Sequence, residues 1–325
     1  EIEELKDCID NLDAQIFGLE NTEFQDMDPN KAKTNFYHEE YIELTKPQST
    51  DYLDVSSEGL DKYSNLISKY FHNIYLINRL TETIAFKGFQ RVHNSDTNID
   101  DLKALIQKNP NNKTINWLPA VQTRGEGIFL QFNETTLDEW ENKPSIQERL
   151  DILINPDDEK RKTQIQSESK DLYRYVLLHT FSHALIKTLV FSCGYGAASI
   201  KERIYTSTST DTSLSMAGIL IYTASGTGDG SLGGLVRMGR PEYLEEAIRT
   251  ALIESEWCSS DPICMDYNFA NSEYDYQSNL AACHNCILLP ETTCESFNSL
   301  LDRGTIVPQI GTDSEIEYFK DYFSS

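Results

Sequence analysis

The clearest hydrophobic patterns lie in the second half of the chain. Residues 172–191 place apolar side chains on one wide face and predict a long helix. Residues 200–206 and 218–224 are typical of strands, and the second is a continuous apolar run, as expected for a buried central strand. Pro241 at a first helical position predicts another helix, which leads into Cys258. A last helix is expected over 290–301.

The first half is patterned less clearly. We expect an acidic helix and linker over residues 1–45, with a break at 27–30. Apolar residues recur at three- and four-residue spacing through 57–82, which predicts an amphipathic helix. Short strands are expected at 84–92, at 117–121 and at 127–132, the last two on either side of Arg124-Gly125-Glu126. Residues 151–170 are charged and predict a loop.

Five of the seven cysteines fall in the last quarter of the chain: Cys258, Cys264, Cys283, Cys286 and Cys294. Five residues separate the first two, Cys283 and Cys286 form a C-x-x-C pair, and eighteen residues separate the pairs. Two thiolate pairs about 15–20 residues apart are typical of a tetrahedral zinc site. Four protein ligands leave no open position for water, so the pattern indicates a structural zinc. The alternative is a set of buried core thiols.

Composition limits the partners that the chain can bind alone. Its net charge is −24, with 52 acidic residues, which argues against strong non-specific DNA binding. Local basic groups at 160–162 and at Arg237 and Arg240 could still contact DNA, although we favour solvated loops. The cysteine usage favours a reducing cytoplasm, and neither a signal peptide nor a membrane-spanning segment is expected. Because the chain begins at Glu1, we expect it to be a piece of a longer protein.

Two histidines four residues apart, His179 and His183, are a second candidate for metal binding. The sequence HTFSH lacks the glutamate of the H-E-x-x-H motif, because Thr180 stands in its place. We favour a buried, hydrogen-bonded pair. The alternative is an open catalytic site of a metal-dependent nuclease or hydrolase, completed by Glu202 or Asp229.

The glycine-rich segment 225–234 follows a predicted strand and could approach a phosphate through its backbone N–H groups. It contains no G-x-x-x-x-G-K-[ST] pattern, and no such lysine occurs elsewhere, so this chain is not by itself a P-loop ATPase. A structural connection between a strand and a helix is the favoured interpretation.

Several separate segments resemble one family, and they occur in that family's order. The segments 178–187, 193–205, 218–236 and 279–304 are similar to the zinc-binding C-terminal domain shared by DrmB proteins and certain DNA-repair helicases. The upstream segments FKGFQRV (86–92) and WLPAVQTRGEGIFLQF (117–132) resemble DrmB more narrowly.

DrmB is a component of the DISARM anti-phage system. The resemblance implies a non-catalytic, DNA-associated subunit that supports a helicase-like partner, DrmA. It also implies that Cys258, Cys264, Cys283 and Cys286 hold a structural Zn²⁺, with Cys294 as a substitute for one of them. The first pair, Cys258 and Cys264, is spaced more widely here than in the helicase relatives. Cys258 is therefore the proposed ligand that departs most from the family pattern.

Together these features predict a mixed α/β (α+β) chain in three parts. Residues 1–56 form an acidic helical arm and linker, 57–170 a small mixed α/β segment, and 171–325 a zinc-stabilised DrmB-like domain. The leading hypothesis is the DISARM subunit. The alternatives are the metal-dependent nuclease or hydrolase and the C-terminal zinc domain of a DNA-repair helicase.

Overall fold

A computed structural model describes ten stretches of the chain, and all structural statements concern them: 29–85, 107–108, 116–117, 120–153, 169–196, 198–207, 215–223, 233–265, 279–308 and 316–323. Several sequence predictions therefore lie wholly or mostly outside the described residues. These are the helix before residue 29, most of the strand at 84–92, most of the loop at 151–170 with its basic run at 160–162, and most of the glycine segment, residues 225–232.

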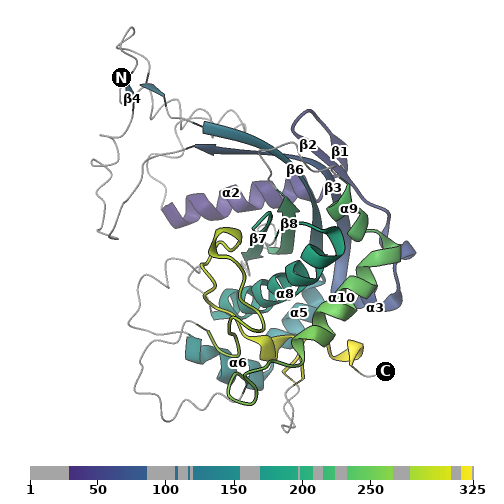
Figure 1. Ribbon diagram of the computed structural model, residues 1–325, viewed down its shortest axis with the longest axis vertical. Helices are drawn as coiled ribbons and strands as arrows, with labels where there is room; N and C mark the ends of the chain where they lie inside the picture. The colour runs from purple at the N-terminus through teal and green to yellow at the C-terminus, as the bar shows by residue number, and fades with distance from the viewer. Residues whose placement is uncertain are drawn as a thin grey trace.

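The centre of the fold is a six-stranded antiparallel sheet with the strand order β1-β2-β3-β6-β8-β7 (Figure 1). It draws strands from each of the three predicted parts of the chain. Its strands are β1 (Gln48–Ser49), β2 (Leu53–Ser56), β3 (Phe71–Ala85), β6 (Ala120–Phe132), β7 (Ile200–Ser207) and β8 (Met216–Thr223). The expected mixed α+β class is confirmed.

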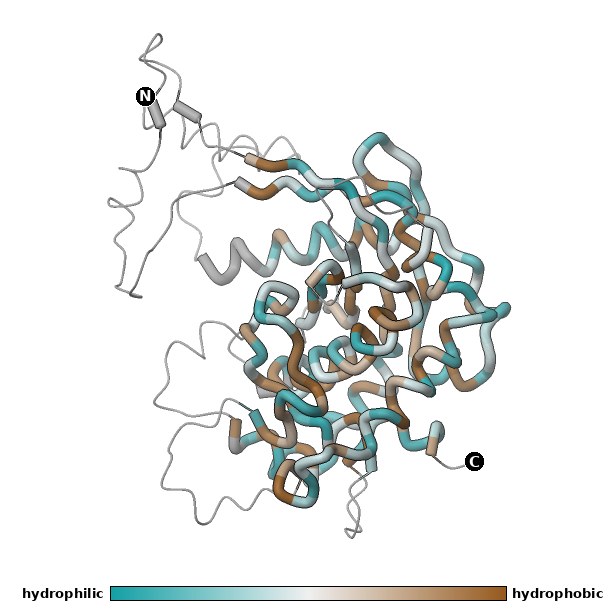
Figure 2. Tube along the Cα trace, viewed as in Figure 1, coloured by the Kyte–Doolittle hydropathy of each residue, from teal (hydrophilic) through white to brown (hydrophobic). Residues whose placement is uncertain are grey.

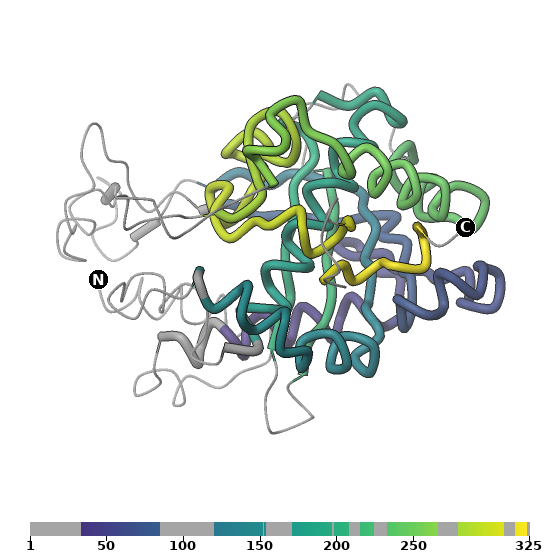
Figure 3. Tube along the Cα trace, turned by 90° about the horizontal axis from the view of Figure 1, so that it is seen from below, coloured from purple at the N-terminus to yellow at the C-terminus, as the bar shows by residue number. Residues whose placement is uncertain are grey.

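Helices cover both faces of the sheet. On one face α2 (Pro29–Leu44) packs through Tyr41 and Leu44 against Phe129 and Leu220. The other face carries α8 (Ser169–Cys193), α9 (Gly234–Met238) and α10 (Pro241–Ser255). Figure 3 shows the purple helix α2 and the green helix α10 on opposite sides of the molecule. In Figure 2 much of α2 is hydrophilic, as expected for a helix that buries only one side.

The remaining elements are short. They are η1 (Leu60–Lys62), α3 (Asn65–Tyr70), the strand pair β4 (Gln107–Lys108) and β5 (Asn116–Trp117), α5 (Glu134–Glu141), α6 (Pro144–Leu150), η2 (Asp151–Leu153), η5 (Glu291–Thr293), η6 (Arg303–Thr305) and η7 (Lys320–Tyr322).

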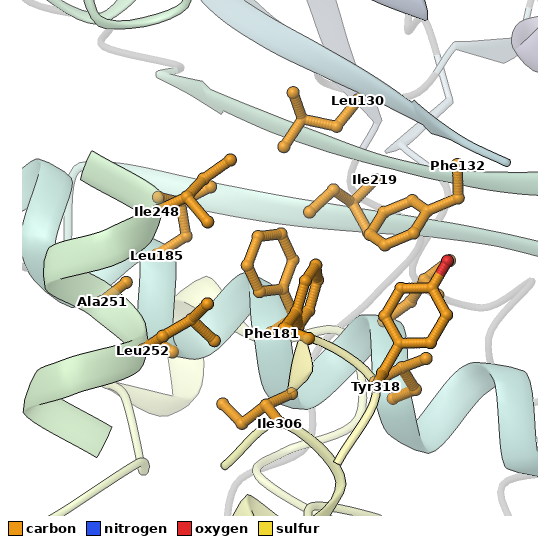
Figure 4. Close-up of a cluster of buried hydrophobic side chains, with 14 of the residues drawn as sticks. Leu130, Phe132, Phe181, Leu185, Ile219, Ile248, Ala251, Leu252, Ile306 and Tyr318 are labelled. Atoms are coloured by element: carbon orange, nitrogen blue, oxygen red, sulfur yellow. The ribbon is translucent and has the colours of Figure 1, made fainter. Parts of the chain in front are cut away.

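The larger core lies between the sheet and α8. Phe181 and Leu185 of α8 meet Phe132 and Ile219 of the sheet, and all four side chains are fully buried or nearly so. Figure 4 shows that α10 and the C-terminal segment close this core, through Leu252 and the residues labelled Ile306 and Tyr318. The cysteine-rich segment is therefore anchored on the same core as the sheet.

Helix α8 satisfies the length and hydropathy criteria for a membrane-spanning helix over Asp171–Cys193, where no such segment was expected. Within the protein, however, 72% of its most apolar window is buried. That burial accounts for its hydropathy as a core helix.

The strongest predictions of secondary structure are confirmed. The long helix, the two strands that follow it and the helix at Pro241 are α8, β7, β8 and α10. Gly194 follows α8 with a positive φ of 71°, a conformation in which helices commonly end.

The predicted helix over 57–82 is wrong beyond Tyr70. Within this range only η1 and α3 are helical, and Phe71 begins the long strand β3. In this strand Ile74 is buried towards α8, whereas Tyr75 and Ile77 are buried towards α2. Since both faces are covered, the strand lacks the alternation that would have distinguished it from a helix.

The predicted helix over 290–301 is also wrong. Only η5 is helical, and Phe297, Asn298 and Leu300 have φ values of 50°, 59° and 66°. The Asn298 side chain accepts a hydrogen bond from the Leu289 N–H at 2.9 Å and donates one to the Leu289 carbonyl at 2.8 Å. These local side-chain bonds hold the segment as a loop.

The strand predicted at 127–132 and the end of the one predicted at 117–121 belong to one continuous strand, β6, whereas Trp117 belongs to β5. Gly125 does not interrupt it. A Cβ atom at this position would lie 1.5 Å from the carbonyl oxygen of Thr223, so the glycine permits the close approach of β8.

Gly125→Ala is therefore expected to destabilise the protein. The added methyl group must displace the backbone of Thr223, and overpacking of this kind costs about 1–3 kcal/mol or more. Urea unfolding followed by circular dichroism measures the change. Gly194→Ala serves as a comparison, because its Cβ would meet no atom within 4 Å and only its positive φ is strained. A Gly125→Ala protein as stable as the wild type would contradict the close approach.

Candidate metal centre

Four cysteines from two separate segments converge beyond the end of α10. Cys258 follows this helix directly, and Cys264 lies on the next turn. Cys283 and Cys286 lie on a turn in which the N–H groups of Cys286 and Ile287 donate to the Cys283 carbonyl at 3.2 and 3.1 Å. The four sulfur atoms lie within 4.8 Å of one another. The structure thus brings together the four residues that the sequence proposed as ligands.

The distances between the sulfur atoms fit a shared metal ion. Cys258 Sγ lies 3.5 Å from Cys283 Sγ, and Cys264 Sγ lies 3.7 Å from Cys286 Sγ. Within the C-x-x-C pair, the sulfurs of Cys283 and Cys286 are 3.6 Å apart. A disulfide would require about 2.05 Å. Sulfurs at the corners of a tetrahedron with zinc–sulfur bonds of about 2.3 Å lie about 3.8 Å apart. The donor set is therefore appropriate for Zn²⁺.

The protonation of the thiols is uneven. Burial raises the pKa of Cys286 to about 11 and raises that of Cys264 above its usual value. At Cys283 burial acts in the same direction, but backbone hydrogen bonds at Asn285 and the neighbouring thiols lower the pKa to about 7. One thiolate thus forms near neutral pH, and further ionisation requires a compensating cation. A bound Zn²⁺ supplies that charge and displaces the protons.

Charged residues outside the cysteine group hold its first turn in place. Asp261 Oδ2 accepts a hydrogen bond from the Cys258 N–H at 2.8 Å, and its Oδ1 pairs with Arg303 Nη2 at 2.6 Å. Arg303 is fully buried and also donates to the Ser255 carbonyl at 3.0 Å. Sequence analysis missed this pair, because an aspartate and an arginine 42 positions apart carry no common motif.

Cys294 does not join the four cysteines. Its sulfur lies 3.1 Å from His179 Nε2, in a second buried group that also contains His183 and Glu202. The expected burial of the histidine pair is therefore seen, and both rings lie within hydrogen-bonding distance of Glu202. Asp229, the other carboxylate considered with them, lies outside the described residues.

His179, Glu202 and Cys294 of this second cluster have shifted pKa values. Burial lowers the pKa of His179, against the opposing effect of Glu202. For Glu202, burial raises the pKa, but the two histidines outweigh it and the net shift is downwards. Burial, with a contribution from Glu202, raises the pKa of Cys294 to about 12.

The described end of the glycine-rich segment is occupied by a carboxylate of the chain itself. Buried Glu126 accepts hydrogen bonds from the Gly233 N–H, from the Leu235 N–H at 2.8 Å and from the Tyr195 hydroxyl at 2.9 Å. These N–H groups at the start of α9 are therefore not available to a phosphate. This observation supports the structural interpretation for residues 233–235.

Glu126→Gln is expected to destabilise the junction between β6 and α9. The neutral amide presents one accepting oxygen and one donating NH₂ group where three donors now converge. Leaving a buried donor unpaired costs about 1–3 kcal/mol. Differential scanning fluorimetry and urea unfolding measure the loss. An unchanged midpoint would contradict the described role of Glu126.

Arg237 and Arg240, the basic residues of the described chain that were considered for DNA contact, are both exposed. Exposed Arg237 stacks on Tyr243, with its guanidinium carbon 4.4 Å from the ring centroid, and Arg240 is the exposed residue that precedes α10. Contact of these two arginines with DNA stays a prediction.

Comparisons with known proteins agree with the arrangement of the site. Residues 181–287 match the family model of the MrfA zinc-binding domain, which includes the four cysteines and excludes Cys294. The chain is 40% identical over 245 residues to the DISARM protein DrmB of Bacillus paralicheniformis. That alignment covers 74% of this chain and 42% of the relative, so the chain spans less than half of the relative's length.

The family match and the cysteine cluster together confirm the prediction of a structural zinc, while the assignment of the four individual ligands stays a prediction. The resemblance to DrmB that the sequence motifs indicated is confirmed over most of the chain. The chain is therefore a homologue of DrmB that carries a zinc-binding domain of the MrfA type.

Proposed function

We propose that this chain is a non-catalytic subunit of a DISARM-type anti-phage defence system, and that it supports a helicase-like, DrmA-like partner in engaging DNA in the cytoplasm. The observation that carries the proposal is the 40% identity to DrmB, which extends well beyond the zinc-binding domain. No G-x-x-x-x-G-K-[ST] motif occurs in these 325 residues, so ATP hydrolysis is assigned to the partner.

Two properties of the surface support association with another protein. The net charge of −24 favours a basic partner. Two large apolar side chains, Trp257 and Ile263, remain exposed immediately before the two cysteines of the first pair. The zinc fixes the backbone that presents them, and we propose that they contact the helicase-like subunit.

Co-expression with a DrmA-like helicase tests the proposal. We expect the two proteins to co-purify, and we expect this chain to change the helicase's DNA affinity or DNA-stimulated ATPase rate. Trp257→Ala should weaken the association without altering the melting temperature. Tyr52→Ala is the matched control, because Tyr52 is equally exposed but lies between β1 and β2. If the two proteins neither associate nor affect each other's activity, the proposal is wrong.

The alternatives receive less support. A catalytic metal requires an open coordination position, whereas His179, His183 and Glu202 are fully buried. Magnesium- or manganese-dependent DNA cleavage that is abolished in His183→Ala would reverse this preference. The repair-helicase hypothesis accounts for residues 181–287, but the similarity to DrmB covers a larger part of the chain.

A further inference from the structure

A second group of metal-ligating side chains lies inside the protein, apart from the four cysteines. His179 and His183 project from α8, Glu202 comes from β7, and Cys294 follows η5. Their ligand atoms all lie within 4.8 Å of one another. The histidines and Glu202 are completely buried, and Cys294 is buried as well. Three elements that are distant in sequence thus direct these atoms to one point.

The distances between these atoms resemble the edges of a coordination tetrahedron. Glu202 Oε1 lies 3.0 Å from His179 Nε2 and 3.1 Å from His183 Nε2. His179 Nε2 lies 3.1 Å from Cys294 Sγ. With metal–nitrogen and metal–oxygen bonds of about 2.1 Å and a metal–sulfur bond of about 2.3 Å, such edges measure about 3.4–3.6 Å. To bind a metal ion, these ligand atoms need to move apart by only a few tenths of an ångström.

When His183 is neutral, the contacts of its two ring nitrogens require an additional cation in the group. His183 Nδ1 faces the Ile287 carbonyl at 3.0 Å, and a carbonyl oxygen can only accept. Nδ1 therefore carries the proton of the neutral ring. The lone pair of Nε2 then faces Glu202 Oε1 at 3.1 Å, so that two acceptors oppose each other without exposure to water. Either an additional proton or a metal ion must lie between them.

Three of the four side chains, His183, Glu202 and Cys294, are also supported in the manner of a metal site. The Ile287 carbonyl orients His183, as a second-sphere acceptor does for a metal-bound histidine. The Ser182 hydroxyl donates to Glu202 Oε2, the oxygen that does not face the histidines. The Asn298 N–H donates to Cys294 Sγ at 3.2 Å.

We propose that His179, His183, Glu202 and Cys294 bind a second divalent metal ion, a structural zinc. Two imidazoles, a carboxylate and a thiolate form a mixed donor set that suits Zn²⁺. Four protein ligands in a buried group leave no position for water, so this ion has no catalytic role. It joins α8 to β7 and to the loop after η5. The proposal is independent of any DISARM function.

Zinc K-edge X-ray absorption and metal analysis test the proposal on tag-free protein purified without added metal. We expect two zinc ions per chain. The absorption spectrum should contain a nitrogen/oxygen shell at about 2.0–2.1 Å beside the sulfur shell at about 2.3 Å. One zinc per folded chain with only sulfur ligands would overturn the second site. One zinc with mainly nitrogen and oxygen ligands would support it and remove the four-cysteine site instead.

Variants locate the second ion. Cys294→Ala and His183→Gln should each lose one zinc and most of the nitrogen/oxygen shell, whereas Cys193→Ala should keep both ions. Cys193 is the control because its thiol lies outside both groups. Folded variants that retain two zinc ions would overturn the assignment. If the variants do not fold, the spectrum of the wild-type protein still decides between a proton and a metal ion.

Discussion

Cys283→Ser should remove the zinc of the four-cysteine group and lower the free energy of unfolding by more than about 4–5 kcal/mol, in the range reached when a protein loses a metal. In zinc-finger peptides, binding of a structural Zn²⁺ contributes about 10–16 kcal/mol to folding. Here the four sulfurs join the segment after α10 to the turn at Cys283–Cys286, on the core that also holds the sheet. Chemical unfolding followed by circular dichroism, with zinc analysis of the same sample, measures both losses.

Cys193→Ser is the matched control for this prediction. It makes the same chemical change at a half-buried thiol whose sulfur contacts the Gly234 carbonyl at 3.6 Å and no other cysteine. We expect a stability change of about 1 kcal/mol or less and an unchanged zinc content, as for a typical single substitution. If Cys283→Ser lost no more stability than Cys193→Ser, the four cysteines would be core thiols without a metal.

Arg174→Met should have the second-largest effect, a loss of about 3–5 kcal/mol, because it leaves a buried charge without its partner. Arg174 projects from α8, and its side chain is 1% exposed. Its guanidinium contacts both oxygens of Glu141 at 3.3 and 3.1 Å, and it reaches Asp138 at 3.0 Å. The side chain of Glu141, at the end of α5, is equally buried.

This loss should depend on pH. Burial raises the pKa of Glu141 to about 7 even though Arg174 opposes the shift, and removal of the arginine raises it further. The contribution of a carboxyl with a raised folded pKa is fully present below its unfolded value of about 4.5. It is lost as the pH rises through the folded pKa. Arg174→Met should therefore lose more stability at pH 8 than at pH 5.

A second substitution tests the cause of this loss. In the Arg174→Met background, Glu141→Gln should restore part of the stability at pH 8 and should remove the pH dependence. Arg249→Met is the control, because its pair with Glu245 at 3.9 Å is half exposed and contributes about 0.5 kcal/mol or less. A pH-independent loss that Glu141→Gln does not rescue would show that packing, rather than charge, is responsible.

The sequence predicted elements whose local pattern agrees with their burial. In α10 the apolar residues lie on one face, and both strands β7 and β8 are rich in β-branched and aromatic residues. The pattern failed at β3, because burial on both faces removed the alternation of a strand. It failed again after Cys294, where the side chain of Asn298 fixes a loop through bonds that no periodicity encodes.

The four cysteines could be proposed as a group because ligand spacing is a local property of the sequence. The placement of Cys294 could not, since its neighbours His179 and Glu202 are more than ninety positions away and are brought to it by the sheet. The same limit applies to Arg174 and Glu141. This pair forms only when α5 and α8 have packed together, so no local sequence motif predicts it.

Cobalt substitution most directly tests the claim that the four cysteines hold one metal. We would replace zinc with Co²⁺ in the Cys294→Ala protein, in which only the four-cysteine group retains thiolate ligands, and record the absorption spectrum. We expect strong thiolate-to-cobalt charge-transfer bands and intense tetrahedral d–d bands at one Co²⁺ per chain, both lost when Cys283→Ser is added. A folded protein that binds no Co²⁺, or whose spectrum is unchanged by Cys283→Ser, would contradict the four-cysteine site.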